Sequence, residues 1–158
     1  DNGSVACTGL NDVYQLGLGN TTDSTTLQYV VGLDLDAYRV DIGQRVGCAH
    51  LVNGSMTCWG FDEWGLFGYS TLNYASLSAT TATKFVDFGT GRTAASISVG
   101  SRHACAVLDT GALVCWGRNH KSQLGLGNMT QQWIPVEVTN VSTLYTHMVH
   151  EQLVFCAL

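Results

Sequence analysis

The sequence of 158 residues contains very little proline and few charged side chains. Proline occurs once and charged residues make up 12% of the chain, whereas hydrophobic residues make up 46% and glycine occurs 18 times. So much hydrophobic material with so little charge excludes an intrinsically disordered chain. Frequent glycine turns, together with many Val, Leu and Thr residues, favour short β-strands over helices. We therefore predict one all-β domain over residues 1–158.

Three further absences exclude classes of function. The Lys and Arg residues number seven, form no basic run and leave a net charge of −5, which does not suit a nucleic-acid backbone. No stretch approaches the 18 apolar residues of a membrane span. None of the six cysteines lies in a CxxC pair, so zinc is a poor explanation for them. Because initiator Met and signal peptide are both missing, we expect a mature chain or a segment of a longer one.

The cysteines follow a repeated pattern. CAHLVNGSMTCWG (48–60) nearly recurs as CAVLDTGALVCWG (105–117), with two cysteines ten positions apart around a glycine-containing turn. A three-residue turn that includes Asn53 and Gly54 places the two cysteines of the first copy opposite each other in a hairpin, at a separation that a disulfide can bridge. The predicted disulfides are Cys48–Cys58 and Cys105–Cys115.

Other landmarks return with a period of about 50 residues, which indicates a repeat architecture such as a propeller. The run QLGLGN follows Cys7 and follows Cys115 at the same spacing, and a degraded copy, LFGYST, follows Cys58. We divide the chain into approximate units 1–47, 48–104 and 105–158, the first of which is completed by residues 148–158 of a neighbouring copy.

The segment GSRHACAVLDTGALVCWGRNHKSQLGLGN (100–128) resembles the repeat of the regulator of chromosome condensation (RCC1) family. The family pattern is approximately G-x-x-H-x-CAL-x-x-(D/N)-G-x-V-x-CWG-x-N-x-x-GQLG-x-G. The other copies are weaker, with Val46 at the His position and Thr8 at the Trp position. The resemblance implies about three β-propeller blades, each a four-stranded antiparallel sheet, with Trp59 and Trp116 packed between blades. Family members exchange nucleotides on a small GTPase, dock on chromatin or inhibit enzymes, so the fold alone does not identify the function.

The two ends of the chain carry the two halves of the repeated hairpin. VFCAL at the C-terminus followed by DNGSVAC at the N-terminus recreates it, so we expect Cys7 to bond Cys156 of a neighbouring copy. Three blades are too few to close a propeller, and open sheet edges invite pairing. The chain is then one period of a tandem polypeptide, a subunit joined head to tail in an open filament, or half of a six-bladed ring. We favour an extended assembly; the remaining alternative is a fragment of a seven-bladed propeller.

Five Asn-x-Ser/Thr sequons accompany the cysteines. They lie at Asn2, Asn20, Asn53, Asn128 and Asn140. Paired cysteines and sequons together indicate a secreted, oxidised protein that carries N-linked glycans. Four of these sequons fall at hairpin turns or after the QLGLG runs, where we expect exposed loops.

We predict no catalytic residues, no cofactor and no metal site. DFG (87–89) lacks the other kinase motifs. His147 and His150 lie three apart, so they face opposite sides of a strand and make a poor metal site with Glu151. DLDAYRVD (34–41) lacks a calcium-loop pattern. Its acidic residues are Asp34, Asp36 and Asp41.

The expected function is therefore structural. We expect a non-enzymatic extracellular glycoprotein that forms the repeating unit of a filament, appendage or surface coat, with other copies of itself as partners. The alternative is a secreted propeller module that recognises a protein or carbohydrate through aromatic loop residues. Its candidate residues are Trp64, Phe67, Tyr69 and Trp133. A nuclear exchange factor ranks third, because paired cysteines and sequons conflict with that compartment.

Overall fold

The structure is a computed structural model that describes residues 3–33, 37–69, 77–79, 81–139, 148–150 and 155–157. Every regular element in these ranges is a β-strand. In chain order the strands are β1 (Ala6–Gly9), β2 (Ser24–Tyr29), β3 (Ala37–Ile42), β4 (Val46–Leu51), β5 (Met56–Asp62), β6 (Leu77–Ala79), β7 (Ala94–Val99), β8 (His103–Leu108), β9 (Leu113–Gly117), β10 (Gln132–Glu137), β11 (Met148–His150) and β12 (Phe155–Ala157). The described part of the chain contains no helix that is long and apolar enough to cross a membrane.

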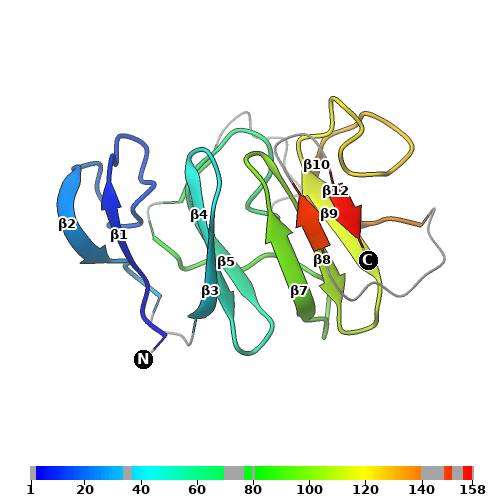
Figure 1. The fold of residues 1–158 in the computed structure, drawn as a ribbon, viewed down its shortest axis with the longest axis horizontal. Coiled ribbons are helices and arrows are strands. Elements are labelled where there is room, and N and C mark those ends of the chain that lie inside the picture. Colours follow the sequence, from blue (N-terminus) through cyan, green and yellow to red (C-terminus); the bar gives the residue numbers. More distant parts are fainter. Residues whose placement is uncertain are drawn as a thin grey trace.

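The strands form two complete sheets and two separate strand pairs (Figure 1). Blade 1 has the order β3-β4-β5-β6 and blade 2 has the order β7-β8-β9-β10, and all neighbouring strands are antiparallel. The N-terminal pair, β1–β2, precedes blade 1, and the C-terminal pair, β11–β12, follows blade 2. The predicted all-β fold of four-stranded antiparallel blades is confirmed. The units predicted from the cysteines begin at the second strand of a blade, because Cys48 and Cys105 lie in β4 and β8.

The second strand of each blade is buried on both faces. All six residues of β4 and all six of β8 are buried. One face of β4 packs on the N-terminal unit and the other on blade 2, and one face of β8 packs on blade 1 and the other on Leu124 and Val138. Such strands need side chains that are apolar or small. The sequences VGCAHL and HACAVL meet this requirement with Gly47, Ala49, Ala104 and Ala106.

The hairpin between β4 and β5 turns through three residues, 52–54. The backbone N–H of Leu51 donates to the carbonyl of Ser55, and that of Gly54 donates to the carbonyl of Leu51, both at 2.9 Å. Gly54 has φ of 79°, the left-handed conformation that a three-residue hairpin loop requires. The hairpin of blade 2 makes the same two bonds at 2.9 Å. This turn sets the register that pairs the two cysteines of each hairpin.

A tryptophan locks each blade to the loop of the unit before it. Trp59 and Trp116 are both 0% exposed, as the family resemblance implied. The Trp116 indole N–H donates to the backbone carbonyl of Leu66 at 2.8 Å, and that of Trp59 donates to the carbonyl of Gln15 at 3.0 Å. Each indole lies against a glycine of the same loop, because a Cβ on Gly68 would come within 2.8 Å of the Trp116 indole nitrogen.

The loop at the end of the third strand of each unit is held by one buried polar side chain, which is an amide in the N-terminal pair and in blade 2. Asn11 and Asn119 are both 0% exposed. The Asn11 Oδ1 accepts the N–H of Leu16 at 2.9 Å, and the Asn119 Oδ1 accepts the N–H of Leu124 at 3.0 Å. Blade 1 has a carboxylate, Asp62, at the equivalent position.

The Asp62 carboxylate is 2% exposed and accepts three backbone N–H groups. Its Oδ1 accepts from Trp64 and Leu66, both at 2.9 Å, and its Oδ2 accepts from Phe67 at 2.8 Å. Burial raises the pKa of this carboxyl, an effect that the backbone hydrogen bonds oppose. Asp62 therefore fixes the loop that receives Trp116. Its negative charge is unfavourable there because the carboxylate is removed from water.

We predict that Gly68→Ala destabilises the fold by about 2–4 kcal/mol, because the new Cβ adds a clash with Trp116 to the strain of a positive φ. Gly125→Ala is the matched control. Gly125 occupies the same place in its repeat with φ of +67°, but among the described residues its Cβ would meet only Val138 Cγ1, at 3.6 Å. The control should lose about 1 kcal/mol. Urea unfolding measures both losses, and equal losses would show that Trp116 does not depend on the glycine.

We also predict that Asp62→Asn gains stability relative to the wild type as pH rises. Because the folded protein holds the Asp62 proton more tightly than the unfolded chain, the contribution of this group is largest below the ordinary pKa of 3.8 and is lost as pH rises through the raised value. The measurement is the difference between the two free energies of unfolding, from about pH 3 to about pH 7. A difference that stays constant would contradict the raised pKa.

Candidate interaction site

The N-terminal pair has the register of the outer half of a blade. Cys7 pairs with Gln28 as Cys115 pairs with Val136. Each ladder contains a bulge between its cysteine pair and the glycine that ends the cysteine's own strand, which is Gly9 in β1 and Gly117 in β9. Strands β1 and β2 therefore correspond to β9 and β10, and the inner edge of β1 has no partner strand among the described residues.

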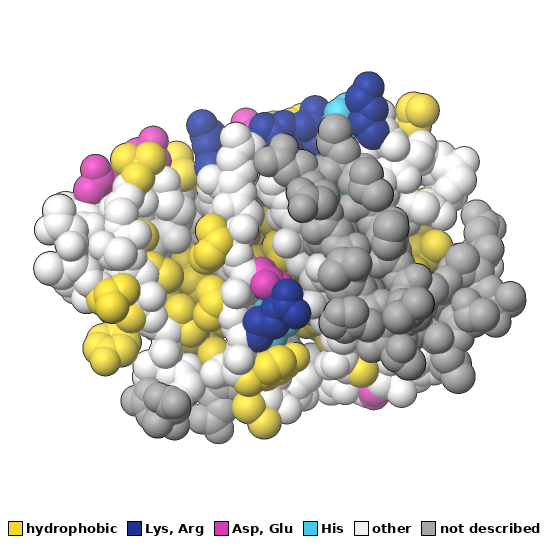
Figure 2. Space-filling model, in the orientation of Figure 1, with side chains coloured by type: hydrophobic (Ala, Val, Ile, Leu, Met, Phe, Trp, Pro, Cys, Tyr) yellow, Lys and Arg dark blue, Asp and Glu magenta, His cyan; other side chains and the backbone are white. Residues whose placement is uncertain are grey.

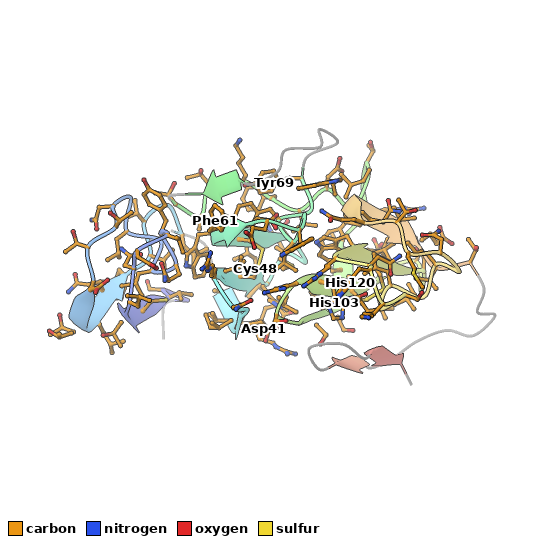
Figure 3. The ribbon with its side chains drawn as sticks, turned by 90° about the horizontal axis from the view of Figure 1, so that it is seen from above. Asp41, Cys48, Phe61, Tyr69, His103 and His120 are labelled. Carbon is orange, nitrogen blue, oxygen red and sulfur yellow. A yellow bond between two sulfur atoms is a disulfide. The ribbon has the colours of Figure 1, made fainter. Side chains whose placement is uncertain are left out.

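The C-terminal pair has the register of the inner half of a blade. Val149 pairs with Cys156 as Ser98 pairs with Cys105. Strands β11 and β12 therefore correspond to β7 and β8. Seen from above, the N-terminal pair, blade 1 and blade 2 follow one another, and the C-terminal pair lies beside blade 2 (Figure 3). The chain thus presents two complete blades and two complementary half-blades.

A groove of about 450 Å³ lies between the N-terminal pair and blade 1. Hydrophobic side chains gather over this junction (Figure 2). The apolar residues that line the groove include Val5, Ala6, Leu10, Leu27, Val40 and Ile42. Val40 is 37% exposed, whereas Ile97, at the equivalent position of blade 2, is 4% exposed because blade 1 covers it. The groove is therefore the position that the inner half of a preceding blade would fill.

Cys7 lines this groove with an unpaired thiol. It is half-buried, and burial raises the pKa of the thiol above its ordinary value. The thiol therefore stays protonated at neutral pH and reacts slowly as a nucleophile. The predicted partner, Cys156, has a described backbone position, but its side chain lies outside the described residues.

The other four cysteines of the described residues are bonded within the blades. Cys48 bonds Cys58 and Cys105 bonds Cys115, each with Cα atoms 4.1 Å apart. All four are at most 1% exposed. Buried bonds within hairpins act as staples, because no reductant or partner thiol reaches them without unfolding.

Three of the five sequons fall on described residues, and all three share one geometry. The asparagines Asn20, Asn53 and Asn128 are exposed. Each Oδ1 accepts the backbone N–H of the hydroxyl residue two positions on, at 2.8–2.9 Å. This is an Asx turn. In two of the three sites the amide nitrogen also donates to the backbone carbonyl two positions earlier, from Asn20 to Leu18 at 3.4 Å and from Asn128 to Leu126 at 3.3 Å. Asn2 and Asn140 lie outside the described residues.

The loop aromatics divide into two groups. Phe67 is 1% exposed and belongs to the core between the blades. The prediction that Phe67 is available to contact a ligand is therefore wrong. Tyr69 stacks on Phe67 with ring centroids 5.4 Å apart. Trp64 and Trp133 are half-buried and remain accessible. Phe67 is buried because Asp62 turns the loop inward, which the sequence of a degraded repeat does not reveal.

No group of three metal-ligating side chains occurs among the described residues. In the acidic run, Asp41 pairs with Arg39 at 3.0 Å and with His50 at 3.0 Å. Asp87 of the DFG run accepts the N–H of Gly89 in a local turn. The other candidate acidic and His residues have side chains outside the described residues, namely Asp34, Asp36, His147, His150 and Glu151.

Two models of the regulator of chromosome condensation (RCC1) repeat match this chain, over residues 94–123 and 110–151. The ultraviolet-B receptor UVR8 of Arabidopsis thaliana is 28% identical over 144 residues, which are 90% of this chain and 32% of UVR8. Human WBSCR16 superposes with a TM-score of 0.74 at 21% identity, over 99% of this chain and 40% of its own.

Yeast RCC1 (Prp20), in its complex with Kap60, superposes with a TM-score of 0.74 at 18% identity, over 94% of this chain and 36% of its own. The chain therefore spans 32–40% of the length of these three relatives. At this identity the two structural likenesses establish the fold and leave activity and partners to be argued from the chain itself.

Proposed function

This chain is built from RCC1-type repeats, and we propose that it is a non-enzymatic extracellular glycoprotein whose copies assemble by completing one another's blades. The two half-blades carry this proposal. In the assembly, the C-terminal pair of one copy lies against β1 of the next, fills the apolar groove and covers Val40 and Ile42. The same contact serves copies joined in one polypeptide and copies that are separate subunits.

The register of the two half-blades supports a disulfide between copies. In blades 1 and 2 the second and third strands meet at a cysteine pair. Cys7 occupies the third-strand position and Cys156 the second-strand position of the blade that two copies would share. Antiparallel pairing of β12 with β1 would bring these residues opposite each other.

The covalent chemistry of the chain supports an extracellular location. Two buried disulfides are typical of proteins that mature in an oxidising compartment. Sequons on exposed loops suit N-linked glycans, which would coat the assembly without entering the core. We expect the assembly to be extended, since heterologous contacts between identical units propagate unless the rotation closes.

We predict that Ile42→Asp abolishes assembly. Ile42 is 66% exposed in the groove, so the change leaves the fold intact and places a charge where the neighbouring half-blade must be buried. Val52→Asp is the matched control, since Val52 is 69% exposed at the hairpin turn. Sedimentation velocity and electron microscopy should show particles for the wild type and the control and monomers for Ile42→Asp.

Disulfide mapping of the native protein provides a second readout of the same contact. We expect a peptide pair that links Cys7 to Cys156. A native protein that sediments as a monomer with a free Cys7 thiol would exclude the proposed assembly.

We further predict that the native protein carries glycans at Asn20, Asn53 and Asn128. Enzymatic removal of N-linked glycans should lower the intact mass and convert each occupied asparagine to aspartate. Peptide mapping locates the conversions. Unmodified asparagine at all three sites would contradict the proposal that the protein is a glycoprotein. It would not bear on the contact between half-blades, which the disulfide mapping tests separately.

A further inference from the structure

Four of the seven Lys and Arg residues of this acidic chain gather at one end of the blades. Figure 2 shows Lys and Arg side chains in a row along the upper edge, with a His beside them. We call this surface the cationic row. It consists of Arg45, Arg102, Arg118, His120 and Lys121. The row lies at the turns between first and second strands and after the third strands, opposite the stapled hairpin turns.

The repeat itself generates the row. Arg45 and Arg102 occupy the same position in successive blades, directly before the buried second strand. The backbone carbonyl of each arginine accepts a hydrogen bond from the N–H of the residue three positions after the third-strand cysteine. Phe61 donates to Arg45 at 2.9 Å, and Arg118 donates to Arg102 at 2.8 Å. Since residue 118 is arginine where blade 1 has phenylalanine, blade 2 doubles the positive charge at this position.

The guanidinium groups are held in place before any ligand arrives. Arg102 donates from Nε and Nη2 to the Oε1 of Gln44 in blade 1, at 3.0 Å and 2.7 Å. The guanidinium carbon of Arg118 lies 4.2 Å from the centroid of the Trp64 ring, and that of Arg102 lies 5.8 Å from it. Stacking on an aromatic ring fixes the plane of a guanidinium, and the Arg102 donors that do not bond Gln44 stay available to an anion.

The positive charge of the row is poorly compensated. In the part of the chain that the structure describes, both ion pairs join Asp41 to residues outside the row, Arg39 and His50. Glu63 is the acidic side chain whose charge acts on Arg118. Desolvation and the neighbouring cations lower the pKa of Arg118 and of His120. An anion on the row would relieve this crowding of like charges.

Two N–H donors within the row also lack an acceptor. The Nε of Arg118 and the indole nitrogen of Trp64 are both buried without a hydrogen-bond partner in the described structure. Buried donors in native proteins are nearly always satisfied, so each of these two N–H groups is a donor that a water or an anion beside the guanidinium groups can satisfy.

We propose that the cationic row binds an anionic polysaccharide, whose sulfate or carboxylate groups pair with the arginine edges. Cations at equivalent positions of successive blades fit a stiff polymer with regularly spaced charge. The guanidinium groups lie over Trp64 and Phe61, which disfavours a single-stranded nucleic acid, because its bases need free aromatic faces. The choice of a polysaccharide over an acidic protein rests on the extracellular location proposed above.

The test compares two double variants that remove the same charge. Arg45→Gln with Lys121→Gln removes two exposed cations from the row. Lys84→Gln with Arg92→Gln removes two exposed cations from the segment between β6 and β7, beside the stapled hairpin turns. Heparin supplies the sulfated probe and polygalacturonate the carboxylated one, and biolayer interferometry measures Kd. The row variant should bind at least one probe about tenfold more weakly, and the control less than about twofold.

Three outcomes would overturn the proposal: equal weakening in both variants, no binding of either polysaccharide by the wild type, or tighter binding of polyglutamate or double-stranded DNA at equal charge. Circular dichroism of each variant confirms that it is folded. Because Arg45 also lines the groove that the neighbouring half-blade fills, sedimentation velocity of the row variant checks that its assembly is unchanged. With that control and the Cys7–Cys156 map, a failure of polysaccharide binding and a failure of blade completion can be told apart.

Discussion

The hydrogen bond from a buried indole to a backbone carbonyl in the preceding unit is the contact on which the rest of the fold depends. It requires a loop that presents a carbonyl at the blade interface, and the side chains of Asn11 and Asp62 hold that loop. It also requires a glycine beneath the ring, since any Cβ there would occupy the position of the indole. Losing a buried Trp costs about 3–5 kcal/mol, more than the roughly 2–3 kcal/mol of a disulfide that closes so short a loop. The blades are thus held together by packing, and the disulfides act within them.

Much of the fold follows from local spacing in the sequence. Ten residues between two cysteines, with a glycine near the middle, specify a hairpin whose register brings the cysteines together, and Cys48 and Cys58 pair in that register. The burial of Phe67 could not be predicted, because it depends on three backbone N–H groups turning toward a single buried carboxylate. The cationic row could not be predicted either. Arg45 and Arg102 are scattered in the sequence and meet only because equivalent positions of successive blades lie side by side.

The unit that contains β1 differs from the two complete blades at the position after its third-strand cysteine. Thr8 stands there, exposed to solvent, where the blades carry a buried tryptophan. A junction formed at β1 therefore lacks the indole that locks blade 1 and blade 2. Its stability has to come from the apolar groove and from strand pairing, so in a stack of such units this junction is the one that opens first.

The position of the disulfides has a mechanical consequence. Each bond joins residues separated by 10 positions, in the middle two strands of a blade, so tension along the chain passes across the sulfur atoms instead of through the hairpin. A stretched blade can release its first and fourth strands, but about 30 Å of contour length stays locked in every hairpin. Under load, a series of such blades would lengthen in limited steps and keep a folded remnant in each, from which the outer strands can pair again when the force falls.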